Sequence, residues 1–402
     1  MMNSISKKCI ASFAALLLSS FTFAVETGGL ISNDTKLSNI EKEGSLKIDQ
    51  KNAVNLWLRA PINEDGTSYF ITEGLFQTDY DDAVPESDQK LKLTLDLSLF
   101  KLVLHKELDS GSVNFSAGRF FNSDLSGIIY TQNGDGAKLE AKISRINISA
   151  FAAFTGLLNA KTNTILTEPT PANSSPVLTD KSKEIYVTAD KYLVSALTFS
   201  LPHIIASQTI SLEGFGAFSF ESTTFNRIYA TAALNGPIVA PVFYNISSTF
   251  SFTKYDESDM KTGNLTKGAI TVYPNFKSMS ISLNGLYASG KQGSFERFVA
   301  FTSGTAVTST KETEYSSLLK AGLSASIKPV RTLILRAGGD LVFDAAESIN
   351  YAGIQCSAGF NWQALSDVSL GASFSQYIGK EDYEESIGAS KTQIKINAAI
   401  AF

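Results

Sequence analysis

This sequence has very few residues of the kinds that enzymes use to move protons or to bind metals. Its 402 residues include two histidines, His105 and His203, and two cysteines. Neither histidine has a serine two residues further on, and the sequence nowhere shows the spacing of metal ligands. We therefore expect no catalytic residues, no metal, no cofactor and no enzyme activity.

Cysteines that could form a disulfide and long apolar runs are also scarce. Cys9 lies in an N-terminal leader, so Cys356 is the one cysteine of the mature chain and an internal disulfide is excluded. After residue 24 no run approaches the roughly 18 apolar residues that a membrane helix needs. Such a chain can still cross a membrane as a closed β-barrel, because closure satisfies every backbone group. The formal net charge of −5 argues against a nucleic acid partner.

The first 24 residues have the features of a secretory signal peptide. Lys7 and Lys8 give a basic start, residues 11–18 form an apolar run, and Ala24 ends the segment. This order of regions predicts cleavage after Ala24. The mature chain is therefore expected outside the cytoplasm.

The sequence is rich in apolar and polar residues that alternate with a period of two, the pattern of a strand with one apolar face. Residues 91–99 hold five leucines in register with four polar residues, a spacing that would scatter the leucines around a helix. The last strand, 392–402, places isoleucines on one face and Lys395 with two amides on the other. Similar alternation covers residues 137–143, 210–220, 319–327, 333–343, 351–362 and 368–375.

The terminal strand resembles the C-terminal recognition signal of bacterial outer-membrane β-barrels. Ile396, Ile400 and Phe402 carry the resemblance, and we assign them to a C-terminal assembly signal. The resemblance implies a porin-like protein of the cell outer membrane. Its partners would be outer-membrane lipid, an outer leaflet of lipid A or a similar lipid, and the barrel assembly machinery.

A second stretch is similar to a pattern of porin-like proteins, with Gly118-Arg119 at a strand end and Asp135-Gly136 opening the next strand. Two interpretations of Arg119 stay open. It can be a structural cation just above an aromatic at the membrane boundary. It can also reach a lipid phosphate or the pore mouth.

Short and long connections alternate along the chain, as in outer-membrane barrels with short periplasmic turns and longer outer loops. We therefore predict an all-β fold: a single closed antiparallel transmembrane β-barrel of about 16 strands, with about 14 to 18 open. The predicted parts are a signal peptide over 1–24, a periplasmic lead-in or small plug segment over 25–52, and the outer-membrane β-barrel over 53–402.

Charged side chains at the inward positions of the predicted strands are assigned to the pore lining. One interpretation is ordinary lumen polarity, the rule for barrels of this size. The other is a constriction with a mild anion preference, because six of these residues are basic and four are acidic. Tyr351 and Tyr377, also inward by parity, could stack on a sugar. The charged pore-lining residues are Lys92, Asp96, Lys138, Glu140, Lys142, Glu213, Lys320, Arg336, Asp340 and Lys395.

The strand count favours a porin, that is, a channel for passive diffusion of small hydrophilic solutes, because barrels of about 16 to 18 strands leave an aqueous channel. Two alternatives stay open. One is a transporter of hydrophobic substrates similar to the fatty-acid uptake barrels, with residues 25–52 as a hatch. The other is a surface adhesin or structural barrel whose long loops, 156–183 and 290–316, bind a partner. Alternation does not separate a monomer from a homo-oligomer.

Overall fold

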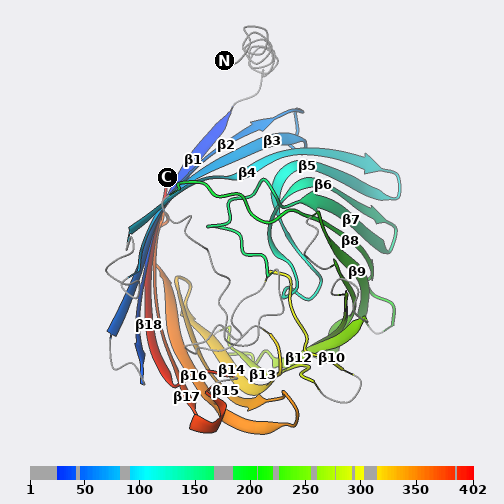
Figure 1. Ribbon diagram of the computed structural model, residues 1–402. Helices are drawn as coiled ribbons and strands as arrows, with labels where there is room; N and C mark the ends of the chain where they lie inside the picture. Colours follow the sequence, from blue (N-terminus) through cyan, green and yellow to red (C-terminus); the bar gives the residue numbers. More distant parts are fainter. Residues whose placement is uncertain are drawn as a thin grey trace.

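The chain folds into one antiparallel β-sheet that closes on itself (Figure 1). The predicted signal peptide, residues 1–24, lies outside the described residues, as do 167–183 and 303–314 of the two predicted long loops. The computed structural model describes residues 25–41, 46–81, 91–166, 184–205, 207–220, 226–254, 260–276, 278–291, 295–302, 315–384 and 387–402.

Eighteen strands form the sheet. The described residues also include a short 3-10 helix, η1 (Glu381–Tyr383), and none of their helices is long and apolar enough to cross a membrane. In chain order the strands are β1 (Glu26–Ile40), β2 (Leu46–Pro61), β3 (Tyr69–Asp81), β4 (Leu91–Leu108), β5 (Gly111–Ser123), β6 (Thr131–Ile143), β7 (Ile146–Phe154), β8 (Tyr192–Leu201), β9 (Thr209–Ser219), β10 (Asn226–Val239), β11 (Val242–Lys254), β12 (Lys261–Val272), β13 (Ser280–Ala288), β14 (Leu318–Val330), β15 (Leu333–Asp344), β16 (Asn350–Gln363), β17 (Val368–Gly379) and β18 (Lys391–Ala401).

The ring closes where β1 pairs with both β2 and β18. Phe402 N donates to Gly29 O at 3.0 Å, and Gly29 N donates to Phe402 O at 2.8 Å, so the pairing continues to the last residue. The predicted closed antiparallel barrel is confirmed, with eighteen strands where the sequence indicates about sixteen.

The prediction of a lead-in or plug over residues 25–52 is wrong, because β1 and the first part of β2 occupy this stretch. These strands lack clear apolar alternation, since Asn33 and Asn52 occupy positions on the face that is apolar elsewhere. The two strands missing from the predicted count are therefore the ones that close the ring.

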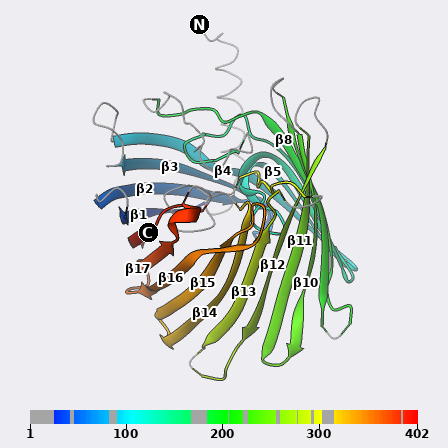
Figure 2. The ribbon, with the colours of Figure 1, turned by 60° about the horizontal axis from the view of Figure 1, so that its bottom comes forward.

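Outward and inward faces follow the predicted parity over most of the wall. Leu93, Leu335 and Ile396 are 38%, 40% and 50% exposed, as expected for side chains on the outer face of a barrel. Figure 2 shows the wall from the side, with β10 to β17 next to one another. Short turns at 144–145, 331–332 and 364–367 join strands at the end where Phe402 lies.

The β5–β6 hairpin bends into the barrel above Gly118, which has a φ of 117°. Gly118 pairs with Gly136 across the two strands. A Cβ on Gly136 would lie 2.0 Å from Ala152 O, and one on Gly118 would lie 2.0 Å from Phe100 O. Glycine at these positions permits the close strand approach that a sharp bend needs.

The lumen contains an apolar cluster that alternation did not predict. It joins inward-facing residues of β7 to β10, and single residues of β12 to β17 such as Leu265, Leu318 and Tyr377, to residues from the connecting loops, and most of its members are fully buried. A barrel of this width is expected to hold water, so the cluster marks a part of the lumen that the loops fill. Its larger members include Tyr130, Phe151, Tyr192, Phe215, Tyr229, Phe298 and Phe301.

We predict that Gly136→Val lowers the free energy of unfolding by about 3 kcal/mol or prevents folding, because the new side chain would overlap the Ala152 carbonyl. The matched control is Gly214→Val on β9, where a Cβ meets no atom within 4 Å. Heat-modifiable migration and urea unfolding of refolded protein measure the difference. Equal stability of the two variants would contradict the bend that we assign to Gly136.

Candidate pore constriction and its open wall

Three of the connections that the structure describes pack against one another in the lumen, and we call them the inner segments. They are residues 124–130 after β5, residues 155–166 with 184–191 between β7 and β8, and residues 295–302 before β14. Figure 1 shows them crossing the space inside the ring of strands. Main-chain hydrogen bonds join all three, from Phe301 N to Ile129 O (3.0 Å) and from Leu166 N to Phe301 O (2.8 Å).

Tyr130 lies at the centre of the packing between the inner segments and the wall. Its ring centroid is 5.8 Å from that of Phe151 on β7, 5.6 Å from that of Phe215 on β9, and 6.3 Å from that of Phe301. Contacts of this kind add stability beyond the apolar area that they bury. Burial raises the pKa of the Tyr130 phenol, so it stays neutral and donates to Asn133 O at 2.8 Å.

Residues 124–130 are held by charged side chains of the segment and of the wall. The Asp124 carboxylate accepts from Ser126 N (2.7 Å) and from Tyr130 N (2.9 Å), which fixes the tight turn. Glu213 on β9 accepts from Leu125 N at 2.8 Å, and Lys267 on β12 donates to Ser126 O. The segment is therefore attached to β9 and to β12, which are separated by β10 and β11.

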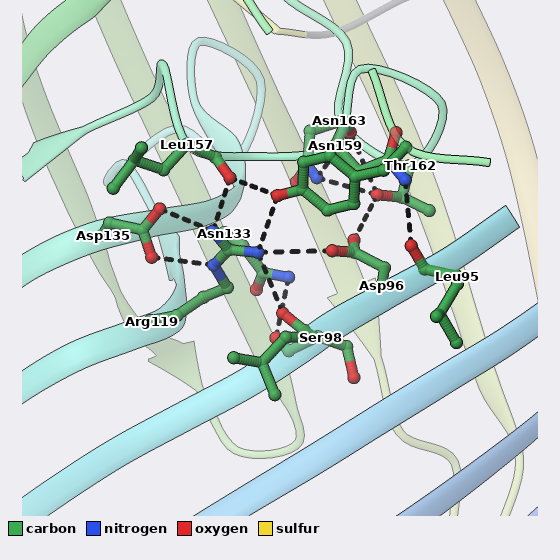
Figure 3. A network of polar contacts seen from close by, with 12 residues as sticks. Leu95, Asp96, Ser98, Arg119, Asn133, Asp135, Leu157, Asn159, Thr162 and Asn163 are labelled. Atoms are coloured by element: carbon green, nitrogen blue, oxygen red, sulfur yellow. Dashed lines mark hydrogen bonds and ion pairs between the residues drawn. The ribbon is translucent and has the colours of Figure 1, made fainter. Parts of the chain in front are cut away.

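Arg119 fastens residues 155–166 to the wall (Figure 3). Its Nε and Nη2 bond the two oxygens of Asp135 at 2.7 and 2.8 Å, a bidentate pair. Its Nη1 lies 3.2 Å from Asp96 Oδ1, and its Nη2 also donates to Leu157 O at 2.6 Å. The Arg119 and Asp96 side chains are 8% and 2% exposed, so the guanidinium is a buried charge bonded on several sides.

The same contacts cover a free strand edge. β4 pairs with β5 only from Leu108 to Phe100, and its remaining residues pair with β3 alone. Unbonded carbonyls at such an edge are costly in a membrane. Side chains of β5 and of the inner segment bond them instead, from Arg119 Nη1 to Leu97 O (3.1 Å), from Asn159 Nδ2 to Leu95 O (3.2 Å) and from Lys161 Nζ to Leu93 O (3.0 Å).

Residues 295–302 are attached to β10. Arg227 Nη1 donates to Ala300 O at 2.9 Å, and the Tyr229 hydroxyl donates to Val299 O at 2.8 Å. The Arg227 guanidinium also lies 5.8 Å from the centroid of the Phe301 ring, within the range of a cation–π contact. This third inner segment therefore covers the inward face of β10.

Inward residues of β11 to β18 outside the apolar cluster border open space, and we call them the open wall. Leu265, Leu318 and Tyr377 of these strands belong to the cluster instead. Two hollows of about 560 and 370 Å³ lie along it. Lys320 sits 3.2 Å from Asp340 in the smaller hollow, which also has Tyr315 and Asn284 on its lining. Charged residues that line the two hollows are Lys267, Lys320, Arg336, Lys395 and Asp340. Four bases against one acid give this wall an excess of positive charge, which the pairing of Lys395 with Asp34 of β1 at 3.4 Å reduces but does not cancel.

The structure divides the ten predicted pore-lining residues into three groups. Lys320 with Asp340, and Arg336 with Lys395, line the open wall. Asp96 and Glu213 face inward but are covered by the inner segments and bonded to them. Of the remaining four, Lys138 pairs with Glu140 at 2.7 Å, Lys92 lies on β4 and Lys142 lies beside the 144–145 turn. A role in permeation stays a prediction for all ten.

Two expectations about aromatic and cationic residues are wrong. Tyr351 does not face the lumen, because a bulge at Ala352 shifts the register against β15. Tyr377 is 1% exposed and belongs to the apolar cluster, so it offers no face to a sugar. Arg119 reaches neither lipid phosphate nor the pore mouth, because it is buried against Asp96 and Asp135.

The outward positions of two residues in the assigned assembly signal follow from the period-two alternation. The inward position of Lys267 could also have been predicted from it. Ile400 and Phe402 of the assigned assembly signal are 46% and 66% exposed on the outer face, and their role in assembly stays a prediction. Lys267 was not in the predicted lining, although it alternates with Gly268 and Ile270 as an inward residue should.

The fold has counterparts among solved structures, although no protein-family model and no curated protein matches the sequence. The outer membrane protein opdK from Pseudomonas aeruginosa aligns with a TM-score of 0.60 at 9% identity, over 94% of this chain and 98% of opdK. OccK9 (OpdG) of the same organism gives 0.62 at 9% identity, over 95% and 99%. OccK2 (OpdF), solved in complex with glucuronate, gives 0.59 at 10% identity, over 94% and 98%. At the level of the fold, the prediction of a porin-like outer-membrane β-barrel is confirmed.

We predict that Arg119→Met releases residues 155–166 from the wall and costs about 3 to 5 kcal/mol, because it leaves the buried Asp96 carboxylate and the partly buried Asp135 carboxylate without their cation. Trypsin should then cleave after Lys161, which mass spectrometry of the fragments detects.

The matched control for this prediction is Lys138→Met. It breaks the partly exposed Lys138–Glu140 pair and should cost about 0 to 1 kcal/mol without new cleavage. An Arg119→Met protein as resistant to trypsin as the Lys138→Met protein would show that Arg119 does not hold the segment.

Proposed function

We propose that this protein is an outer-membrane channel that lets small hydrophilic solutes diffuse passively and that favours anions. The observation that carries the proposal is the open wall, where four bases and one acid line the two hollows. Positive side chains in a narrow, partly dry passage raise the local concentration of anions. The fold shared with opdK supports placement in the outer membrane.

The filled part of the lumen supports selectivity as well as passage. The inner segments pack most densely against β7 to β10, and the two hollows lie along β11 to β18, which leaves that side as the route for solute. Barrels of 16 to 18 strands would otherwise enclose a wide aqueous channel. A narrowed route brings each solute close to Lys267, Lys320 and Arg336.

The two alternative functions receive less support. A hydrophobic-substrate transporter of the fatty-acid type would use residues 25–52 as a hatch, but β1 and β2 place the described part of this stretch in the wall. The hollows along the open wall are lined by lysine, arginine, serine and asparagine side chains, which suit water-soluble substrates. No specific observation favours an adhesin.

We predict that the refolded protein in planar bilayers conducts in discrete steps and has a chloride-to-potassium permeability ratio above one in a salt gradient. The double variant Arg336→Glu with Lys395→Glu should lower the ratio by about tenfold, because it reverses two charges of the open wall. Arg145→Glu, in an exposed turn at the rim, is the matched control and should leave the ratio nearly unchanged. A sealed bilayer, or an equal ratio in all three proteins, would contradict the proposal.

A further inference from the structure

The outward face of β1, β2 and β3 carries polar side chains where a lipid-facing wall is expected to be apolar. Register places Asn33, Asn52 and Thr78 on one row, between the row of Ile31, Val54 and Phe76 and the row of Thr35, Gln50 and Tyr80. Phe76 is 47% exposed, which identifies this face as the outer one. We call the polar set of this face the polar island: Asn33, Thr35, Gln50, Asn52 and Thr78.

The two asparagines of the polar island lie near the centres of β1 and β2, and Thr78 lies near the end of β3. Asn33 occupies the centre of β1, and Ile31 and Leu37 face outward on either side of it. By contrast, the outward positions of β7, β9, β14 and β15 hold only aliphatic, aromatic, proline and glycine residues. Outer-membrane barrels normally present an apolar band at this height.

Hydrogen bonds within the polar island use only part of its capacity. Asn33 Nδ2 donates to Asn52 Oδ1 at 2.7 Å, Asn52 Nδ2 donates to Thr78 Oγ1 at 3.4 Å, and Thr35 Oγ1 donates to Asn33 Oδ1 at 3.2 Å. A primary amide has two N–H donors and an oxygen with two lone pairs. Each of the two asparagines therefore retains one N–H and one lone pair for a partner outside this barrel.

Asn264 on β12 is an outward amide whose hydrogen bonds are made within the barrel. It is 8% exposed, and its Nδ2 donates to both Ser248 Oγ (3.1 Å) and Thr249 O (3.2 Å). Its Oδ1 accepts from Thr266 Oγ1 at 3.0 Å. Asn52, in contrast, is exposed and makes fewer bonds, so the polar island is not a second case of local satisfaction.

The surface around the polar island is concave. A hollow of about 260 Å³ lies over Asn33, Asn52 and Ala398, and the side chains of Ile31, Ile400 and Phe76 border it. Small and medium residues at its floor therefore lie between larger apolar ones. Such a surface can receive a projecting apolar side chain while its floor bonds polar groups.

We propose that the polar island is the contact face for a second copy of this chain. Two barrels inserted in the same direction can be related by a two-fold axis along the membrane normal, which places the same face of each against the other. Amides suit such a face because each one donates and accepts, so Asn33 and Asn52 of one copy match those of the other. Phe76 of each copy then has the hollow of its partner to enter.

Hydrocarbon around the barrel explains why the second copy is favoured over lipid. An acyl chain offers no hydrogen bond, and an unbonded polar group in an apolar medium is costly. Lipid headgroups lie at the boundaries and do not reach the middle of a strand. A paired copy satisfies the amides and removes Ile31, Val54 and Phe76 from lipid in the same step.

Cysteine cross-linking tests this inference in membranes. In a Cys356→Ala background, Asn52→Cys should give a cross-linked dimer with a short bis-maleimide, at a yield at least about tenfold above that of Leu335→Cys on the outward face of β15. A dimer at both positions in equal yield, cross-linking of Asn52→Cys to a different protein, or no cross-link would overturn the proposal.

The double variant Asn33→Leu with Asn52→Leu provides the second measurement. It replaces amides with apolar residues suited to lipid, so the barrel should fold and keep its heat-modifiable migration and single-channel conductance. Mass measurement of gently extracted protein should show wild-type dimer and variant monomer. Wild-type protein that is monomeric at all concentrations, or a variant that stays dimeric, would contradict the role of the polar island.

Discussion

The requirement that every backbone N–H and C=O in the membrane be bonded determines the rest of this structure. Pairing of β1 with β18 meets it around the ring. The sheet alone does not meet it along the first half of β4, because the β5–β6 hairpin bends inward at Gly118 and leaves these residues unpaired with β5. Arg119, Asn159 and Lys161 bond the exposed carbonyls there. The bend therefore brings the inner segments into the lumen, and the lumen becomes a filled half and an open, basic half.

Period-two alternation was sufficient to predict the fold class, because one apolar and one polar face recur along most strands, as in β4 and β15. It missed β1 and the first half of β2, since outward asparagines break their pattern. It could not predict the apolar cluster either. In β8 the inward Tyr192, Val194 and Ala196 are as apolar as the outward residues, and only the packing of distant loops gives the reason.

The individual inward charges of the candidate site were predictable from the sequence, but their arrangement in the lumen was not. Inward charges could be recognised strand by strand, but sequence parity cannot tell a charge that meets water from one that holds a loop. Glu213 and Lys320 were both predicted to face inward. Glu213 accepts a hydrogen bond from Leu125 N, whereas Lys320 lines the open wall. Arg119 and Asp135 occupied a recognisable pattern, and their direct pairing across β5 and β6 follows only from the register.

Labelling of single cysteines with a charged, water-soluble thiol reagent tests the division of the lumen most directly. In membranes, and in a Cys356→Ala background, Ser357→Cys on the open wall should react rapidly, because Ser357 is exposed and borders the larger hollow. Ser116→Cys also points inward but is 2% exposed in the structure, so it should react slowly, as should the lipid-facing Leu335→Cys. Equal, rapid labelling of Ser357→Cys and Ser116→Cys would show that the lumen is open throughout and would contradict this account.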